Sequence, residues 1–192
     1  MKVVETLEGS GDSFRVRTAT AADVTELVRL RSLLLQGHNT YYATNDEQER
    51  HLWQRRFVDW LVRTAPTDNN CCVAVIATPD GTSLTACGIG VVDQRPPGPG
   101  ILDGRSGWIQ SVVTDPTWRR RGMADHIMDY LMCWFRERRV GRVLLHTTSD
   151  GANLYHRHGF RPCGEEALVA QLEQLMAEDT DRPVILFQAG QE

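Results

Sequence analysis

One segment, residues 112–124, constrains the fold more than any other part of the chain. It starts with the β-branched run Val112-Val113-Thr114, breaks at Asp115-Pro116, passes through Arg119-Arg120-Arg121 and reaches Gly122, where a helical apolar pattern begins. This order predicts a strand, a basic turn and a helix N-terminus in succession. Such a turn offers free backbone N–H groups and the positive end of a helix dipole. Since arginines also pair with phosphate oxygens, the segment predicts a site for a ligand that carries pyrophosphate.

Length and charge limit the class of protein. At 192 residues with 41% hydrophobic residues, the chain suits one domain with its own core. We predict a flexible tail over residues 1–12 and a single domain over 13–190. A net charge of -4 argues against a nucleic-acid partner. No run approaches the roughly 18–20 apolar residues of a membrane span, and the start lacks the apolar core of a signal peptide, so we expect a cytoplasmic protein without a membrane partner.

The cysteines predict buried, reduced thiols. There are five of them, two are adjacent, and no pair has the spacing Cys-x-x-Cys. His156, His158 and Cys163 also lack the ligand spacing of a closed metal site. We therefore expect no metal.

Alternating and helical apolar patterns predict a mixture of strands and helices. Helices are expected after Thr20, after Asn45 or Asp46, and over residues 123–138, 152–158 and 165–177. Strands are expected over residues 14–17, 71–77, 85–92, 108–114, 143–147 and 183–188. This order indicates an α+β fold with a mostly antiparallel sheet and helices on its faces. Gly88-Ile89-Gly90 lies inside an apolar strand with no third glycine, so it predicts close packing or a bulge rather than a dinucleotide site.

Two motifs resemble one family. Arg119-x-x-Gly122-x-Ala124 matches the Arg/Gln-x-x-Gly-x-Gly/Ala signature of the GNAT family, the acyl-coenzyme A dependent N-acyltransferases. Residues 154–160 resemble the family's Leu-Tyr-x-x-x-Gly-Phe segment. The order of elements from residue 14 to 160 is also similar to the family, whereas a helix at 165–177 fits it less well. The resemblance implies a GNAT-like fold with a mostly antiparallel central sheet and helices on both faces.

The resemblance also implies acetyl-CoA as co-substrate. In similar proteins the strand at 108–114 diverges from the strand at 143–147, and the pantetheine arm enters that gap. The pyrophosphate then lies on the turn from Arg119 to Ala124. The residues expected to contact the cofactor are Val112, Val113, Thr114, Arg119, Arg120, Arg121, Gly122, Met123, Ala124, Ser149 and Asn153. Asn153 is equally suited to capping the short helix.

Tyr155 matches the tyrosine that often acts as general acid in the family. A phenol with a pKa near 10 is neutral at pH 7 and can protonate a leaving thiolate. The general base stays open, because Gln110 stands where many relatives have glutamate and cannot take a proton. A water chain, His146, or one of Asp46, Glu47 and Glu49 are the alternatives, and His146 fits a core histidine better.

These observations predict an N-acetyltransferase that transfers the acetyl group of acetyl-CoA to a primary amine of a small acceptor, by direct attack in a ternary complex. A non-catalytic acyl-CoA-binding or regulatory module and an O-acyltransferase are the alternatives. The acceptor stays open, since the acidic net charge favours a cationic amine whereas Arg50, Arg55 and Arg56 favour an acidic amino acid. Dimers are common among similar proteins, so a homodimer is also open.

Overall fold

The computed structural model describes residues 6–7, 14–35, 43–63 and 65–170. Its helices, including the 3-10 turns labelled η, are η1 (Ala21–Asp23), α1 (Val24–Leu35), α2 (Glu47–Arg63), η2 (Pro116–Trp118), α3 (Met123–Glu137), η3 (Ser149–Gly151) and α4 (Ala152–Arg157). Its strands are β1 (Thr6–Leu7), β2 (Phe14–Thr18), β3 (Cys71–Ala77), β4 (Leu84–Gln94), β5 (Arg105–Thr114) and β6 (Arg142–Leu145). In this part of the chain no helix is long and apolar enough to cross a membrane.

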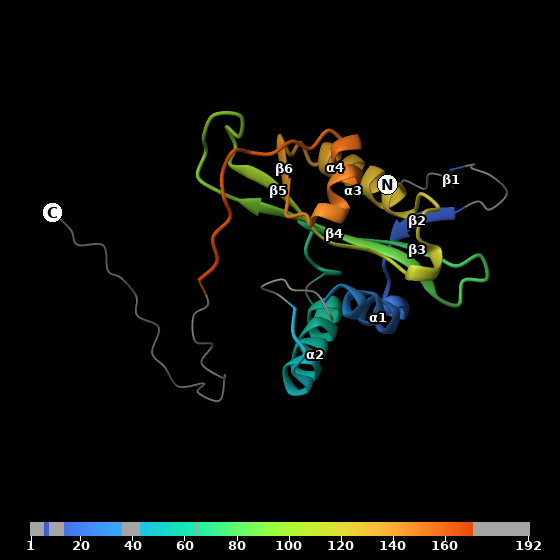
Figure 1. The fold of residues 1–192 in the computed structure, drawn as a ribbon. Coiled ribbons are helices and arrows are strands. Elements are labelled where there is room, and N and C mark those ends of the chain that lie inside the picture. The colour runs from blue at the N-terminus through green and yellow to red at the C-terminus, as the bar shows by residue number, and fades with distance from the viewer. Residues whose placement is uncertain (1–5, 8–13, 36–42, 64, 171–192) are drawn as a thin grey trace. The chain divides into compact units, whose positions relative to one another are not determined.

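The six strands form one sheet in the order β1-β2-β3-β4-β5-β6. Every neighbouring pair is antiparallel except β5 and β6, which run parallel. Figure 1 shows α1 and α2 on one face of the sheet and α3 and α4 on the other. The prediction of an α+β fold with a mostly antiparallel sheet and helices on both faces is therefore confirmed.

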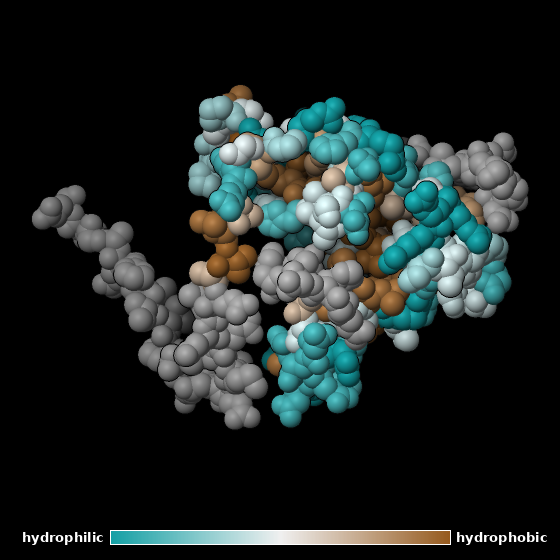
Figure 2. All heavy atoms as spheres, viewed as in Figure 1, coloured by the Kyte–Doolittle hydropathy of each residue, from teal (hydrophilic) through white to brown (hydrophobic). Residues whose placement is uncertain are grey.

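Each face of the sheet has its own hydrophobic core. Ile127, Leu131 and Phe135 of α3 pack on one face, and Leu27, Leu30 and Phe57 of α1 and α2 pack on the other. Along each strand, successive side chains point into one core and then the other, because side chains of a strand alternate between its two faces. The outer surface of α2 is hydrophilic, as Figure 2 shows, so this helix buries only one stripe.

A bulge interrupts the pairing of β4 with β5 at Gly88. Cys87 pairs with Val113 and Ile89 pairs with Gln110, so the extra residue lies on β5, opposite Gly88. Ser111, in this bulge of β5, has φ +52°. A bulge reverses which face the following residues occupy. Accordingly Ile109 lies in the α3-side core, whereas Val113 lies in the core under α1 and α2. The prediction of close packing or a bulge at Gly88-Ile89-Gly90 is confirmed.

Substituting Gly88 is expected to destabilise the fold. A Cβ atom at Gly88 would lie 2.5 Å from Ile127 Cγ2, and Ile127 is fully buried. We expect Gly88→Ala to lower the free energy of unfolding by about 1–3 kcal/mol, the usual effect of overpacking a core, as measured by urea unfolding. Gly98→Ala is the control, because a Cβ there meets nothing within 4 Å. Equal stability of the two variants would contradict the prediction.

A buried carboxylate joins β2 to the start of α1. Asp23 accepts hydrogen bonds from Arg17 Nη1 and Nη2 at 2.7 and 2.8 Å and from the Thr20 backbone N–H at 2.7 Å. Hydrogen bonding to Arg17 holds the pKa of Asp23 below its ordinary value, against the opposing effect of burial. The ionised carboxylate therefore adds stability above about pH 4, and that stability is lost as the pH falls through the lowered folded-state pKa.

We expect Asp23→Asn to lower the free energy of unfolding at pH 7 and to flatten its decline below about pH 4. Urea titrations at pH 7 and pH 3 measure both effects. Asp59→Asn on exposed α2 is the control, since its carboxylate makes only a loose 3.7 Å pair with Arg63. A loss of equal size at pH 7 and pH 3 in Asp23→Asn would argue against the assignment.

Both ends of the chain differ from expectation where they are described. Thr6 and Leu7, inside the predicted tail, pair with Arg15 and Phe14. The contacts divide the chain into two units, residues 1–162 and 163–192, and the domain limits of 13 and 190 stay predictions. The expected helix at 165–177 is wrong over residues 165–170, which form neither helix nor strand. Its remainder and the expected strand at 183–188 lie outside the described residues.

Candidate functional site

The parallel strands β5 and β6 separate halfway along β5. They pair from Ser106 with Arg142 to Ile109 with Leu145, and in the described chain no strand pairs with residues 110–114 on that side. This leaves a length of β5 whose outer backbone groups are available to a ligand that lies along the strand.

The direction of these backbone groups follows from one hydrogen bond. The Asp115 backbone N–H donates to Thr85 O on β4 at 2.8 Å. Since peptide groups alternate sides along a strand, Val113 also faces β4, and its side chain is buried. Val112 and Thr114 face the opposite side, where β6 has diverged. Of the three residues expected to contact the cofactor on this strand, Val112 and Thr114 thus face the gap and Val113 does not.

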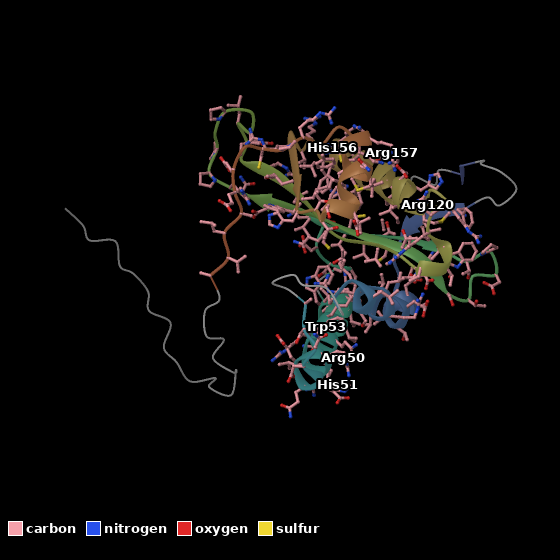
Figure 3. The ribbon with its side chains drawn as sticks, viewed as in Figure 1. Arg50, His51, Trp53, Arg120, His156 and Arg157 are labelled. Atoms are coloured by element: carbon pink, nitrogen blue, oxygen red, sulfur yellow. The ribbon has the colours of Figure 1, made fainter. Side chains whose placement is uncertain are left out.

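The basic turn leads from β5 into α3. Arg120 and Gly122 both have a left-handed backbone, with φ of +65° and +78°, and Gly122 is the N-cap without any side-chain cap. The first N–H groups of α3, from Met123 onward, therefore point out of the helix end. Arg119, Arg120 and Arg121 are exposed around them, and Figure 3 shows Arg120 beside this end of the sheet. Helix dipole, N–H groups and guanidinium groups combine into a site for an anion.

The turn is anchored by contacts that the sequence motif does not contain. The Asp115 carboxylate accepts from the Thr117 backbone N–H at 3.0 Å and from Arg29 Nη1 of α1 at 2.5 Å. Despite partial burial, these hydrogen bonds lower the pKa of Asp115. Arg29 also pairs with Glu26 at 2.9 Å, and Glu26 accepts from the Leu84 backbone N–H at 3.0 Å. The sequence did not indicate the role of Arg29, because Arg29 and Asp115 are 86 residues apart along the chain.

Tyr155 lies on α4, which follows β6 after the short turn η3. It is half-buried at the edge of the α3-side core, with its ring edge toward Phe160 at 6.1 Å between centroids. A Cβ at Gly151 would lie 3.2 Å from the Tyr155 ring, so a glycine there lets the ring pack close to η3. Ser149 opens η3 and is exposed, as is Asn153. Gly151 is the N-cap of α4, so Asn153 does not cap that helix.

Ion pairs hold α4 against the first turns of α3. Arg157 makes a two-pronged pair with Asp125, with both carboxylate oxygens 2.9 Å from Nη2. His158 lies between Asp125 and Asp129, at 3.3 and 3.4 Å. Asp125 is in the first turn of α3, so these contacts join the helix that carries Tyr155 to the basic turn. Figure 3 shows Arg157 on α4, away from α2.

The candidates for a proton acceptor lie in two places. Ile109 and Leu145 pack on the α3 side, so by alternation Trp108, Gln110 and His146 project from the α1/α2 face. His146 is exposed and meets Trp108 edge-to-face at 5.4 Å, so the interpretation of His146 as a core histidine is wrong.

The carboxylates near the start of α2 are engaged locally. Asp46 caps the helix through the Glu49 backbone N–H at 2.7 Å, Glu49 accepts from the Thr44 hydroxyl, and Glu47 pairs with Arg50 at 3.3 Å. Among the described residues, no group of three or more histidine, cysteine, aspartate or glutamate side chains is arranged to hold a metal ion.

Comparison with known proteins identifies a family for the chain. The model of the acetyltransferase (GNAT) family matches residues 31–160, which is more than half of the chain. No curated protein matches the chain significantly.

Solved structures share the fold over most of the chain. A GCN5-related N-acetyltransferase from Ralstonia eutropha has 25% identity and a TM-score of 0.68, over 82% of this chain and 98% of that one. A predicted acetyltransferase with acetyl-CoA from Clostridium acetobutylicum has 24% identity and a TM-score of 0.65, over 84% and 99%. Glucosamine-6-phosphate N-acetyltransferase from Arabidopsis thaliana has 16% identity and a TM-score of 0.62, over 85% and 100%. At 24% and 16%, the last two show similarity of fold alone.

Proposed function

The chain belongs to the GNAT acetyltransferase family, whose chemistry is acyl transfer from acetyl-CoA, and we propose that it acetylates a primary amine of a small acceptor. One observation carries the proposal: β5 and β6 separate next to the exposed basic turn at the N-terminus of α3, within a single unit. The open edge of β5 accommodates an extended arm, and the turn accommodates a pyrophosphate.

Backbone groups and side chains together hold acetyl-CoA at its pyrophosphate and along its pantetheine arm. Arg119, Arg120 and Arg121, with the N–H groups of Gly122, Met123 and Ala124, bind the pyrophosphate. Val112 and Thr114 hydrogen-bond the pantetheine arm along the gap, while Val113 keeps the strand in register with β4. Ser149 and Asn153, both exposed on the η3–α4 corner, contact the far side of the arm.

Acetyl-CoA supplies an activated acyl group, and the protein supplies position and a proton. The amine nitrogen forms a C–N bond with the thioester carbonyl carbon, the C–S bond breaks, and its electron pair leaves on sulfur. Tyr155 gives its phenolic proton to that thiolate. The attacking nitrogen releases one proton, which restores the phenol through water.

His146 is the best-placed side chain to pass on the amine proton. It projects from the face on which α1 and α2 lie, at the point where β6 ends, whereas Asp46, Glu47 and Glu49 are engaged at the start of α2. Gln110, on the same face and exposed, can orient a water molecule but cannot take a proton. A location in the cytoplasm and a homodimer stay expectations from the sequence.

The proposal is tested by mixing the protein with acetyl-CoA and a panel of amines and alcohols, and by following release of free coenzyme A thiol. Cys163 is exposed and would react with a thiol reagent, so the assay uses Cys163→Ser. Thiol release with an amine, and acetylamide found by mass spectrometry, support the proposal. Release only with alcohols favours O-acyl transfer, and binding of acetyl-CoA without turnover favours a non-catalytic module.

A further inference from the structure

A guanidinium group lies where α1, α2 and the β5 bulge meet. Arg31 of α1 donates a hydrogen bond from Nη1 to the hydroxyl of Ser111, the bulge residue. Its Cζ atom is 4.7 Å from the centroid of the Phe57 ring on α2. Burial lowers the pKa of Arg31, although no environment of this kind makes a guanidinium neutral at pH 7. The group is therefore a cation that lies over an aromatic ring and is tied to the β5 backbone segment through Ser111.

Arg31 differs from Arg29, on the same helix, in the groups that balance its charge. Arg29 pairs with two carboxylates, Glu26 and Asp115, whereas in the described part of the chain Arg31 makes no ion pair. A partly buried cation is costly unless an anion accompanies it. One N–H of Arg31 is used on Ser111, which leaves the planar fork suited to two parallel hydrogen bonds with an oxyanion.

Arg31 lies near the proposed position of the acceptor and away from the proposed pyrophosphate site of the donor. In the proposed binding mode, the pantetheine arm runs along Thr114 and Val112, and its thioester end lies toward Gln110 and Ser111. Ser111 joins that point directly to Arg31. Gln110, Trp108 and His146 project from the same face of the sheet. The pyrophosphate turn lies beyond Thr114, at the other end of the arm.

We propose that Arg31 binds an oxyanion of the acceptor, so that the substrate is an amine that also carries a carboxylate or a phosphate within a few bonds of its nitrogen. This inference rests on the proposed acetyl transfer to an amine. It assigns Arg31 a direct contact with the acceptor, while Phe57 and Ser111 orient the guanidinium.

The first arm of the test compares acceptors that differ only in the anion. Matched pairs are β-alanine with its amide, L-lysine with cadaverine, and O-phosphoethanolamine with ethanolamine. We expect kcat/KM to favour the anionic member of at least one pair by tenfold or more. The carboxylate and phosphate pairs show which oxyanion is recognised. Equal use of both members, or a preference for the neutral member, in all three pairs overturns the proposal.

The second arm removes the cation. Arg31→Met is expected to raise KM for the anionic acceptor on the order of 10–100-fold, as loss of a hydrogen bond to a charged group would. KM for acetyl-CoA and for the neutral acceptor should change less than about threefold on the same scale. Arg31→Lys keeps the charge without the fork and should restore part of the affinity. Arg63→Met, which removes an exposed charge at the end of α2, is the matched control.

A purely structural role would have a different signature. If Arg31→Met lowers turnover of anionic and neutral acceptors equally, and Arg31→Lys restores neither, the proposal fails. If no acceptor is acetylated at all, the proposed function fails, and calorimetric titration of the coenzyme A-loaded protein with the same pairs decides the inference. Anion-dependent binding that Arg31→Met abolishes supports it, and equal binding by both variants overturns it.

Discussion

Replacing Tyr155 with phenylalanine is expected to lower kcat on the order of 10²–10⁴-fold, the usual contribution of a positioned general acid. The ring stays, so its packing against Phe160 at 6.1 Å between centroids is retained. The substitution removes the proposed proton donor, so the thiolate must leave unprotonated or take a proton from water. Affinity for acetyl-CoA should be nearly unchanged. Steady-state kinetics with acetyl-CoA and calorimetric titration with coenzyme A measure the two quantities separately.

Tyr130→Phe is the matched control for this substitution. Tyr130 lies on α3, and its hydroxyl is 3.0 Å from the Thr18 hydroxyl, so the change removes one hydrogen bond of a half-buried tyrosine outside the site. We expect it to cost at most a little stability and to leave kcat unchanged. If Tyr155→Phe leaves turnover intact, or if both variants lose turnover equally, Tyr155 is not the general acid.

Gly122→Val is expected to weaken binding of acetyl-CoA on the order of 10–100-fold. Gly122 has φ +78°, a conformation that costs a β-branched residue about 1–3 kcal/mol. Relieving this strain rotates the peptide groups that begin α3, and the N–H groups that we propose to bind the pyrophosphate turn with them. The dissociation constant of coenzyme A by calorimetry measures the effect. Turnover at saturating acetyl-CoA should fall much less, because Tyr155 lies on another helix.

The control separates backbone strain from ligand binding. Gly81, in the turn between β3 and β4, has φ +71°, and a Cβ atom there would meet nothing within 4 Å. Gly81→Val therefore introduces similar strain far from the proposed site. Both valine variants should lose stability in urea unfolding, and only Gly122→Val should lose affinity. Equal affinity of the two variants would rule out the basic turn as the pyrophosphate site.

Local patterns in the sequence predicted most of the elements. Helix α3 and strand β3 have nearly the predicted limits, because each has a regular apolar period. Gly122 marks the start of α3, and the turn before Leu84 marks the end of β3. The expected helix at 165–177 is wrong over residues 165–170, although its apolar spacing is helical. Helical spacing predicts a helix only where a second surface buries the apolar side, and the sequence does not show whether one exists.

The basic turn and the tyrosine segment could be found from the sequence because each is short. The backbone conformation at Gly122 and the charge of Arg119–Arg121 are local properties, so the residues of the motif are enough to predict them. The bulge that turns Val113 and Ile109 to opposite faces lies in the pairing of β4 with β5, and Gly88 of β4 packs there under Ile127 of α3, where a Cβ atom would lie 2.5 Å from Ile127 Cγ2. Gly88 and Ile127 belong to different elements, and no local pattern joins them.

The sequence by itself thus indicated the order of most elements from residue 14 to 160 and the family, and it predicted the basic turn as an anion site. Only the tertiary structure brought together the groups that we propose to surround the acceptor. Arg31, Ser111 and Phe57 come from α1, β5 and α2, and His146 reaches the same face from β6. The physical reason is that pairing across a sheet and packing of helices bring distant residues together, while hydrophobic patterns record only that a residue is buried and not what it meets.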